Sequence, residues 1–337
     1  MQPGRAKLSD VAQLAGVSLA TASRCINHPA KVKPELRERV QKALQELAYV
    51  TNGRARALAT SRSHSIGAVV PTLNISIFAR AAELLQRRLG EAGYTLMLAN
   101  SAYDPAQELA QVKAFLEQGI DGMVLVGAEH DPKVFELLET SATPFILTYT
   151  HAPGSKYPCV GFDNYTSAYR LTEYVVGLGH QRFGLIRTPT QWNDRVAQRL
   201  AGIRAALADH SIADPIEHVL DVPYSIATGR SAFRRLMTGA QPPSAVICTN
   251  DVFGIGALLE SRVLGIEVPK SVSVVGFDDL ELAAEIEPGL TTCQIPIQEM
   301  TDRVVDHLLS GISGRPIPQS VELATKIIIR GSTGRVG

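Results

Sequence analysis

From residue 65 onward, short apolar segments alternate with longer amphipathic segments, and this alternation constrains the fold more than any other feature of the sequence. Strands buried on both faces are short, nearly continuous apolar runs, whereas the helices that cover them carry apolar residues at helical spacing. The pattern predicts parallel sheets with helices on both faces. We expect strands at 66–70, 95–99, 122–126, 145–148, 159–162, 183–186, 245–248 and 272–275. We expect the clearest helices at 79–92, 106–118, 167–178, 196–210, 227–237, 252–264 and 297–309.

Most of the predicted strands end in polar or turn-forming residues. These residues are Pro71, Asn100, Asp163, Asn250-Asp251 and Asp278-Asp279. In open parallel sheets, ligands bind at the carboxyl edge of the strands. The sequence therefore predicts a ligand site at this edge.

Length and composition narrow the class of protein. A chain of 337 residues exceeds what one hydrophobic core usually serves, so we expect several. No apolar run of about 20 residues could span a bilayer, and the polar N-terminus lacks a signal-peptide core, so we expect a cytoplasmic protein. Cys25, Cys159, Cys248 and Cys293 lie far apart without a C-x-x-C pair. We expect reduced, mostly buried thiols, with no disulfide, metal site or cofactor.

The first 50 residues are typical of three short helices. Ser9 is placed to cap the first, whose apolar face would be Val11, Ala12 and Leu14. A tight turn at 15–17 follows, and Ser18 is placed to cap the second helix. The third should run from about residue 34 to 47, with Leu36, Val40, Leu44 and Leu47 at helical spacing.

The segment LSDVAQLAGVSLATASRCIN has the features of a helix-turn-helix. Gly16 permits the sharp turn, small Ala12 and Ala22 allow close helix contact, and Val11, Val17 and Ile26 would fill the core. On the second helix we expect Leu19, Ala20, Ser23, Arg24 and Asn27 to face outward, and Ser18, Thr21 and Ser23 to suit phosphates.

Charge agrees with this interpretation of the head. Residues 1–62 hold eleven Lys and Arg against four acidic residues, a charge of +7, so the rest of this neutral chain carries −7. A basic head on an acidic body suits DNA binding by the head alone. The alternative is a helical hairpin unrelated to DNA, but turn, cap, spacing and charge together favour a DNA-reading head.

The head and its continuation NHPAKVKPELRERVQKALQELAYVTNGRARALAT resemble the lactose/galactose repressor (LacI/GalR) family of transcription regulators. The resemblance extends over the body, where GYTLMLANS, GIDGMVLVG, VGFDN, LGHQRFGLI, RLAG, CTNDVFGIGAL, VPKSVSVVGFDD and LTTCQIP follow the family's order. It implies an all-α helix-turn-helix head plus an α/β two-lobed, periplasmic-binding-protein-like (type I) sensor domain. It also implies a homodimer on a pseudo-palindromic DNA operator.

The resemblance divides the chain into a head (1–50), a hinge (51–63) and a sensor domain (64–337). The first lobe of the sensor would comprise about 64–163 and 294–323, and the second about 164–293 and 324–337. The segment TNGRARALAT is too short for a stable isolated helix, and as a plain linker it would have a solvated basic face. The resemblance instead implies a hinge helix that folds on DNA.

Within this hinge, the resemblance assigns DNA contacts to Asn52, Arg56 and Leu58, with Leu58 as a wedge between central base pairs. Two positions depart from the family. Thr51 stands where proline is usual and Arg54 where an apolar residue is usual, which lowers the expected stability of the paired hinge helices.

The family's ligand positions map onto polar and apolar residues that follow the predicted strands. They are Ile75, Phe78, Thr148, Asp163, Arg199, Tyr224, Asn250 and Asp278. The resemblance implies a small-molecule effector, and Arg199 suits a carboxylate or hydroxyls, so we expect a sugar or sugar acid before a purine. Asp163 and Asp278 could instead cap turns, and Arg199 could form a structural salt bridge. Thr148 departs from the Asp that many members have.

Two rival classes fit the sequence less well. We find no G-x-S-x-G, H-E-x-x-H or G-x-x-x-x-G-K motif for an enzyme, and His180 is expected to be a dipole partner or cap at the end of a helix. A transport-associated binding protein would lack the DNA-binding head and carry a signal peptide. We therefore expect a repressor that an inducer releases. Because no leucine heptad follows KIIIRG, we expect a dimer and no tetramer.

Overall fold

The computed structural model describes residues 6–27, 31–49, 62–73, 76–213, 218–317 and 320–336. The chain divides into two compact units. The smaller contains residues 1–65 with 119–121, and the larger contains the remainder. Among the described residues, no helix combines the length and apolar character needed to cross a membrane.

The small unit contains helices α1 (Leu8–Ala15), α2 (Leu19–Asn27) and α3 (Pro34–Glu46), as predicted. Their shared core contains Val11, Ala15, Cys25, Val40 and Ala43. So small a core leaves few positions that tolerate change, because each side chain forms much of the contact between helices.

Two expectations for α1 are wrong. The helix begins at Leu8 rather than after Ser9, because the Asp10 carboxylate accepts the Lys7 backbone N–H at 2.8 Å and holds the first turn there. Leu14 is 46% exposed and therefore lies outside the core. The Ser18 hydroxyl does cap α2, accepting the Thr21 backbone N–H at 3.1 Å.

The large unit contains two six-stranded sheets. The first has the order β11-β5-β4-β3-β1-β2 and comprises β1 (Ser65–Val70), β2 (Thr95–Asn100), β3 (Gly122–Val126), β4 (Phe145–Thr148), β5 (Cys159–Gly161) and β11 (Ser320–Glu322). The second has the order β12-β10-β9-β8-β6-β7 and comprises β6 (Phe183–Arg187), β7 (Val219–Asp221), β8 (Ala245–Cys248), β9 (Ser273–Asp278), β10 (Thr291–Gln294) and β12 (Lys326–Ile328).

Parallel pairing dominates both sheets. Ile66 lies opposite Gly122 where β1 pairs with β3, and Ala245 lies opposite Ser273 where β8 pairs with β9. Among the described pairings, only β10 and β12 run antiparallel to each other. The chain passes from one sheet to the other after β5, again after β10 and again after β11. The two sheets therefore form two lobes, which these three connecting segments join.

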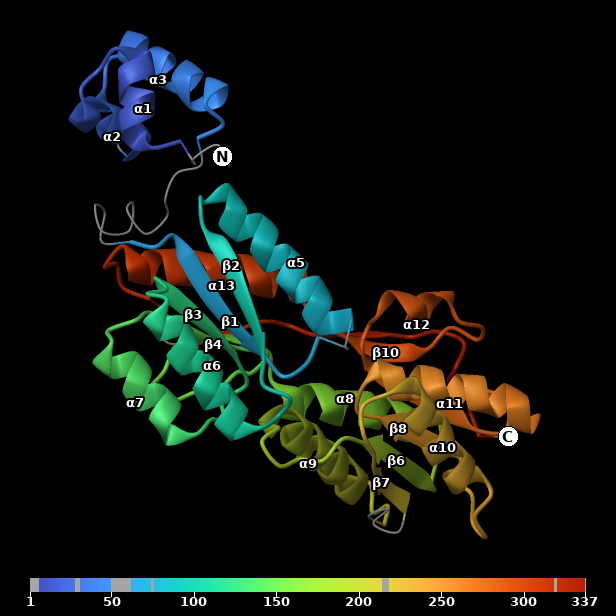
Figure 1. The fold of residues 1–337 in the computed structure, drawn as a ribbon. Helices are drawn as coiled ribbons and strands as arrows, with labels where there is room; N and C mark the ends of the chain where they lie inside the picture. The colour runs from blue at the N-terminus through green and yellow to red at the C-terminus, as the bar shows by residue number, and fades with distance from the viewer. Residues whose placement is uncertain are drawn as a thin grey trace. The chain divides into compact units, whose positions relative to one another are not determined.

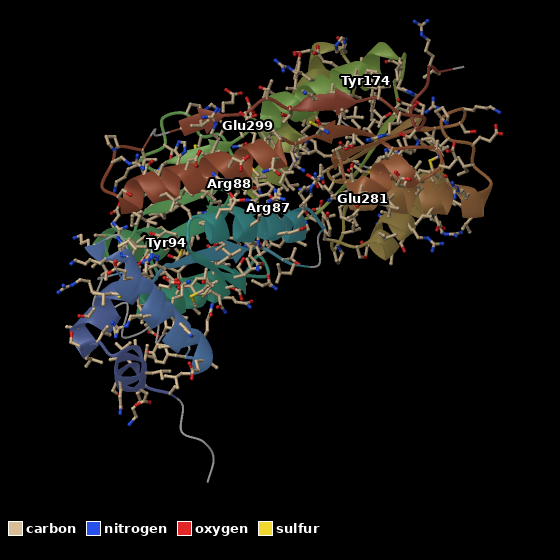
Figure 2. All side chains as sticks on the ribbon, turned by 90° about the horizontal axis from the view of Figure 1, so that it is seen from above. Arg87, Arg88, Tyr94, Tyr174, Glu281 and Glu299 are labelled. Atoms are coloured by element: carbon tan, nitrogen blue, oxygen red, sulfur yellow. The ribbon has the colours of Figure 1, made fainter. Side chains whose placement is uncertain are left out.

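Helices cover both sheets (Figure 1). On the first lobe these are α5 (Ser76–Glu91), α6 (Pro105–Glu117), α7 (Pro132–Thr140) and α13 (Ile297–Ile312). On the second they are α8 (Asn164–Gly177), α9 (Asp194–Asp209), α10 (Ile226–Met237), α11 (Asp251–Leu264) and α12 (Glu281–Glu285). Arg88 joins α5 to α13 through ion pairs with Asp302 at 2.9 Å and Asp306 at 3.2 Å. Figure 2 labels Arg88 where these two helices lie side by side.

All eight predicted strands and all seven predicted helices are present, with boundaries shifted by a few residues. The sequence reading missed short or polar elements: β7, β10, β11, α7 and α12. The strand β10 reads Thr-Thr-Cys-Gln, and its two threonines are fully buried although the segment lacks an apolar run. All four cysteines are free and buried, as expected.

Candidate DNA interface and ligand pocket

The outward face of α2 is the candidate DNA interface. Leu19, Ala20 and Arg24 are exposed, with Leu19 at 54%, while Thr21 and Ser23 are half-buried. The buried side of the helix holds Ala22 and Cys25. The structure therefore presents the predicted DNA-facing residues on one surface. The Asn27 side chain, and Asn52, Arg56 and Leu58 of the predicted hinge, lie outside the described residues.

Arg39 of α3 fixes the turn before this helix. Its Nη2 donates to the carbonyls of Ala15 at 2.6 Å and Gly16 at 3.1 Å, two groups that the end of α1 leaves without helical partners. Gly16 has φ of 63°, and a Cβ there would lie 2.6 Å from Arg39 Nη2. The left-handed backbone therefore favours glycine at this position, and a side chain there would displace Arg39 Nη2 from the two carbonyls. Nothing in the sequence pattern identified Arg39.

The candidate ligand pocket lies within the large unit and is lined from both lobes. The first lobe contributes Ile77, Phe78, Tyr103 and Tyr149. The second contributes Thr188, Asn193, Arg195, Val196, Arg199, Tyr224, Thr249, Asn250 and Asp278. Thr249, Asn250 and Asp278 come at the carboxyl ends of β8 and β9, the edge at which a site was predicted.

Five of the eight predicted ligand residues line this pocket: Phe78, Arg199, Tyr224, Asn250 and Asp278. Ile75 lies outside the described residues. Thr148 is buried but does not line the pocket; its neighbour Tyr149 does. Asp163 caps α8 instead, accepting the Thr166 backbone N–H at 2.9 Å and the Thr166 hydroxyl at 2.6 Å. For Asp163 the structure therefore supports the capping alternative.

Arg199 is held rigidly in the wall of the pocket. Its Nε donates to Asn164 Oδ1 at 2.9 Å, and its Nη1 donates to the Thr249 carbonyl at 2.6 Å. The guanidinium lies 3.6 Å from the centre of the Phe277 ring, and its Nη2 lies 3.6 Å from Asp278 Oδ1. A guanidinium with so many partners cannot rearrange freely, so its orientation is set before any ligand binds.

Asp278 is a buried carboxyl beside this arginine, with 8% of its surface exposed. Burial raises its pKa to about 7, while Arg199 and Arg195 act in the opposite direction and the carboxylate of Asp251 adds to the rise. Because a pKa near 7 allows both forms of the carboxyl, Asp278 can accept or donate hydrogen bonds to a ligand at neutral pH.

Two hydroxyls in the pocket lack a protein partner among the described residues. They are the buried Tyr224 hydroxyl and Thr249 Oγ1. Nearby, Asn250 uses its side-chain oxygen to cap α11, accepting the Phe253 N–H at 3.1 Å. A buried polar group without a partner is unfavourable by about 1–3 kcal/mol, so these groups are suited to a polar ligand or water.

The sequence reading missed Tyr103, Tyr149 and Arg195. Both tyrosines have left-handed backbone conformations, with φ of 59° and 63°, which are uncommon for bulky residues and concentrate at functional sites. The Tyr149 ring meets Phe78 edge-on, with centroids 5.3 Å apart. Their positions depend on local backbone geometry, which periodicity does not reveal.

His180 joins two strands of the second sheet and does not cap a helix. Its Nδ1 lies 3.0 Å from Ser244 Oγ and its Nε2 lies 2.9 Å from Ser273 Oγ, so it bridges two strand starts of the second sheet. Burial lowers its pKa. The residue therefore stabilises the second lobe in its neutral form.

A helix-turn-helix joined in one chain to a two-lobed α/β body with a buried polar pocket defines the class of ligand-responsive transcription regulators. Residues 7–52 match the bacterial regulatory proteins of the lacI family, and residues 172–333 match the periplasmic binding protein-like domain. The chain belongs to the LacI family, as its sequence motifs predicted.

Full-length relatives support this assignment. The HTH-type transcriptional repressor CytR of Escherichia coli K12 is 30% identical over 335 residues, covering 98% of this chain and 97% of CytR. The Lac repressor dimer bound to operator and the anti-inducer ONPF is 26% identical in sequence, with a TM-score of 0.85. The match covers 98% of this chain and 99% of the Lac repressor chain. The regulator CelR, in its complex with cellobiose, is 28% identical in sequence, with a TM-score of 0.70. The match covers 97% of this chain and 100% of the CelR chain.

Proposed function

We propose that this regulator is a repressor that releases operator DNA when a sugar or sugar acid binds in the pocket. The observation that carries the proposal is a pair of buried hydroxyls, those of Tyr224 and Thr249, which have no partner among the described residues and line the same pocket as Arg199 and Asp278. Hydroxyl groups on a small ligand would satisfy both. The CelR–cellobiose complex shows that a relative with this fold binds a sugar.

The proposal includes a homodimer on a pseudo-palindromic operator, in the cytoplasm where the DNA is. Each α2 would enter the major groove, with Arg24 as its main hydrogen-bonding reader. Residues 51–63 would act as a hinge in the central minor groove. Ligand-driven change in the angle between lobes would alter the separation of the two hinges. The ligand is bound and released without chemical conversion, because a regulator of this class responds to occupancy alone.

A second ligand class is favoured by one observation. The pocket contains four aromatic rings, Phe78, Tyr103, Tyr149 and Tyr224, two more than the sequence positions alone indicated. Rings of this kind can stack on a nucleobase. A nucleobase-containing effector is therefore the alternative, and it belongs in the same test.

The test is a thermal-shift screen of sugars, sugar acids, nucleosides and nucleobases against the full chain. A ligand at 100 times its dissociation constant should stabilise the protein by about 2.7 kcal/mol. We expect a hit among the sugars or sugar acids that shifts the wild type and fails to shift Arg199→Ala. A hit among the nucleosides instead would make nucleosides the ligand class. Equal thermal shifts in the wild type and Arg199→Ala would show that the ligand does not bind in this pocket.

Reading of DNA by α2 has its own test. Duplexes selected from a random pool by the wild-type protein should bind Arg24→Ala at least tenfold more weakly, because a base contact is lost. Arg37→Ala is the matched control, since Arg37 is exposed on α3 and was not assigned a base contact. Equal losses in the two variants would indicate general electrostatic attraction in place of base reading.

A further inference from the structure

We propose that Asp194 and Arg195 form a clasp that closes the two lobes over Gly127 and so sets how readily the sensor opens. Both residues lie at the start of α9 in the second lobe. Arg195 Nη1 donates to the carbonyl of Val126 at 3.1 Å, at the end of β3 in the first lobe. Asp194 Oδ2 accepts the backbone N–H of Ala128 at 3.1 Å. Two hydrogen bonds therefore cross between lobes on either side of one glycine.

The clasp is an ion pair as well as a bridge. Arg195 Nη1 lies 2.9 Å from Asp194 Oδ1, and Arg195 is only 6% exposed. A buried ion pair loses much of its attraction to desolvation, so its net contribution depends on the extra hydrogen bonds that it makes. Here those extra bonds go to the opposite lobe. Opening the lobes would break them and hydrate both ions, so the hydration gained would offset part of the attraction lost.

Gly127 is the residue that lets the clasp close. Its φ is +93°, and a Cβ there would lie 1.9 Å from Arg195 Nη1 and 2.5 Å from Asp194 Oδ1. The loop itself is held in place. The Gly127 N–H donates to the Thr148 carbonyl at 2.8 Å, and its carbonyl lies 3.1 Å from Nε2 of buried His130. A side chain at 127 would therefore displace the clasp, in addition to straining the backbone of the loop.

The clasp also reaches the ligand pocket. Arg195 lines the pocket together with Tyr103 of the first lobe. The guanidinium lies near enough to oppose the rise that burial causes in the pKa of the Tyr103 hydroxyl. A ligand that engages Arg195 or Tyr103 would change the partners of the clasp, so one arginine connects occupancy of the pocket to lobe closure. This connection rests on the proposed function, but the clasp itself can be tested without any ligand.

The experiment compares two glycine variants of the full chain. Gly127→Ala introduces the clash, whereas Gly154→Ala, at φ of +82° in the same lobe, imposes similar backbone strain with no atom within 4 Å of the new Cβ. The readout is acrylamide quenching of Trp192, the only tryptophan, which is half-buried beside Tyr103 and Arg195. We expect quenching of Trp192 to rise at least twofold in Gly127→Ala and to match the wild type in Gly154→Ala.

Two further variants make the outcome decisive. Arg195→Ala should also raise quenching, and the double variant Gly127→Ala/Arg195→Ala should resemble either single variant, because both changes remove the same clasp. If Gly127→Ala does not fold, Asp194→Ala takes its place and should raise quenching of Trp192 in the same way. Wild-type quenching in folded Gly127→Ala, or fully additive effects in the double variant, would overturn the clasp. Failure of the ligand screen would leave this result intact and remove only the link to a ligand.

Discussion

Arg199 contacts four residues in the wall of the pocket: Asn164, Thr249, Phe277 and Asp278. We predict that Arg199→Ala weakens binding of the screened ligand tenfold or more. Loss of charge-assisted hydrogen bonds in a buried site costs roughly 1.5–3 kcal/mol. Isothermal titration of both proteins measures this directly. Arg204→Ala, an exposed change on the same helix, is the control; equal dissociation constants for wild type and Arg199→Ala would contradict the assignment.

The carboxyl of Asp278 gives the stability of the sensor a pH dependence of predictable sign. Its pKa of about 7 in the folded chain exceeds the ordinary value near 4, so the folded state holds a proton that the unfolded state has lost between these limits. The free energy of unfolding contributed by this group should therefore fall as pH rises from about 4 to 7, by up to about 1.4 kcal/mol per pH unit.

Urea unfolding at pH 5, 6, 7 and 8 tests this prediction. Asp278→Asn removes the titrating group while keeping its shape, so the wild type should lose stability relative to the variant as pH rises. Asp251, whose pKa burial raises to about 6, and His180, whose pKa burial lowers, titrate in both proteins and largely cancel in the comparison. Parallel stability curves for the two proteins would show that Asp278 has an ordinary pKa.

The residues of the pocket were only partly accessible to sequence reasoning. Arg199, Asn250 and Asp278 occupy positions that follow predicted strands or begin predicted helices, so a motif could locate them. Tyr103 and Tyr149 enter the pocket because of left-handed backbone conformations in short loops, and sequence periodicity carries no such information. Asp163 caps α8 in the structure, and the sequence could not distinguish this role from a ligand contact, because a carboxylate after a strand can cap a helix or face a ligand.

Among the elements, long and strongly periodic segments were predictable and short polar ones were not. The buried β3 reads Gly-Met-Val-Leu-Val and was placed without error, whereas β7 and β11 have three residues each and lie at sheet edges. An edge strand is defined by the neighbour with which it pairs, and that pairing is a tertiary property. The same limitation applies to the hinge, whose proposed helix would depend on DNA and on a second chain.

One prediction concerns the hinge as an element, of which residues 50–61 lie outside the described part of the chain. We predict that Leu58→Ala weakens binding to the selected operator at least tenfold while binding to random DNA changes little. A wedge acts only where the central base step can be kinked, whereas phosphate contacts act on any sequence. Competition titrations at one fixed salt concentration measure both affinities. An unchanged ratio of specific to random affinity would remove the wedge role of Leu58.

At the scale of the whole molecule, the proposal requires two chains acting together. We predict a mass of two chains at micromolar concentration by light scattering, and a selected operator with two inverted half-sites. Symmetric half-sites follow from a twofold dimer because each α2 then reads the same bases in opposite orientation. A monomeric mass in the presence of operator, or a selected site without inverted symmetry, would contradict the assembly.

The central claim is that occupancy of the pocket controls binding of DNA, and one titration tests it. A fluorescent duplex with the selected operator is titrated with the full chain, with and without a saturating amount of the screened ligand, and anisotropy reports binding. We predict that the ligand weakens operator binding at least tenfold, a coupling of about 1.4 kcal/mol or more. The ligand should have no such effect on Arg199→Ala, which should still bind the operator. Equal operator affinity of the wild-type chain with and without bound ligand would contradict the account.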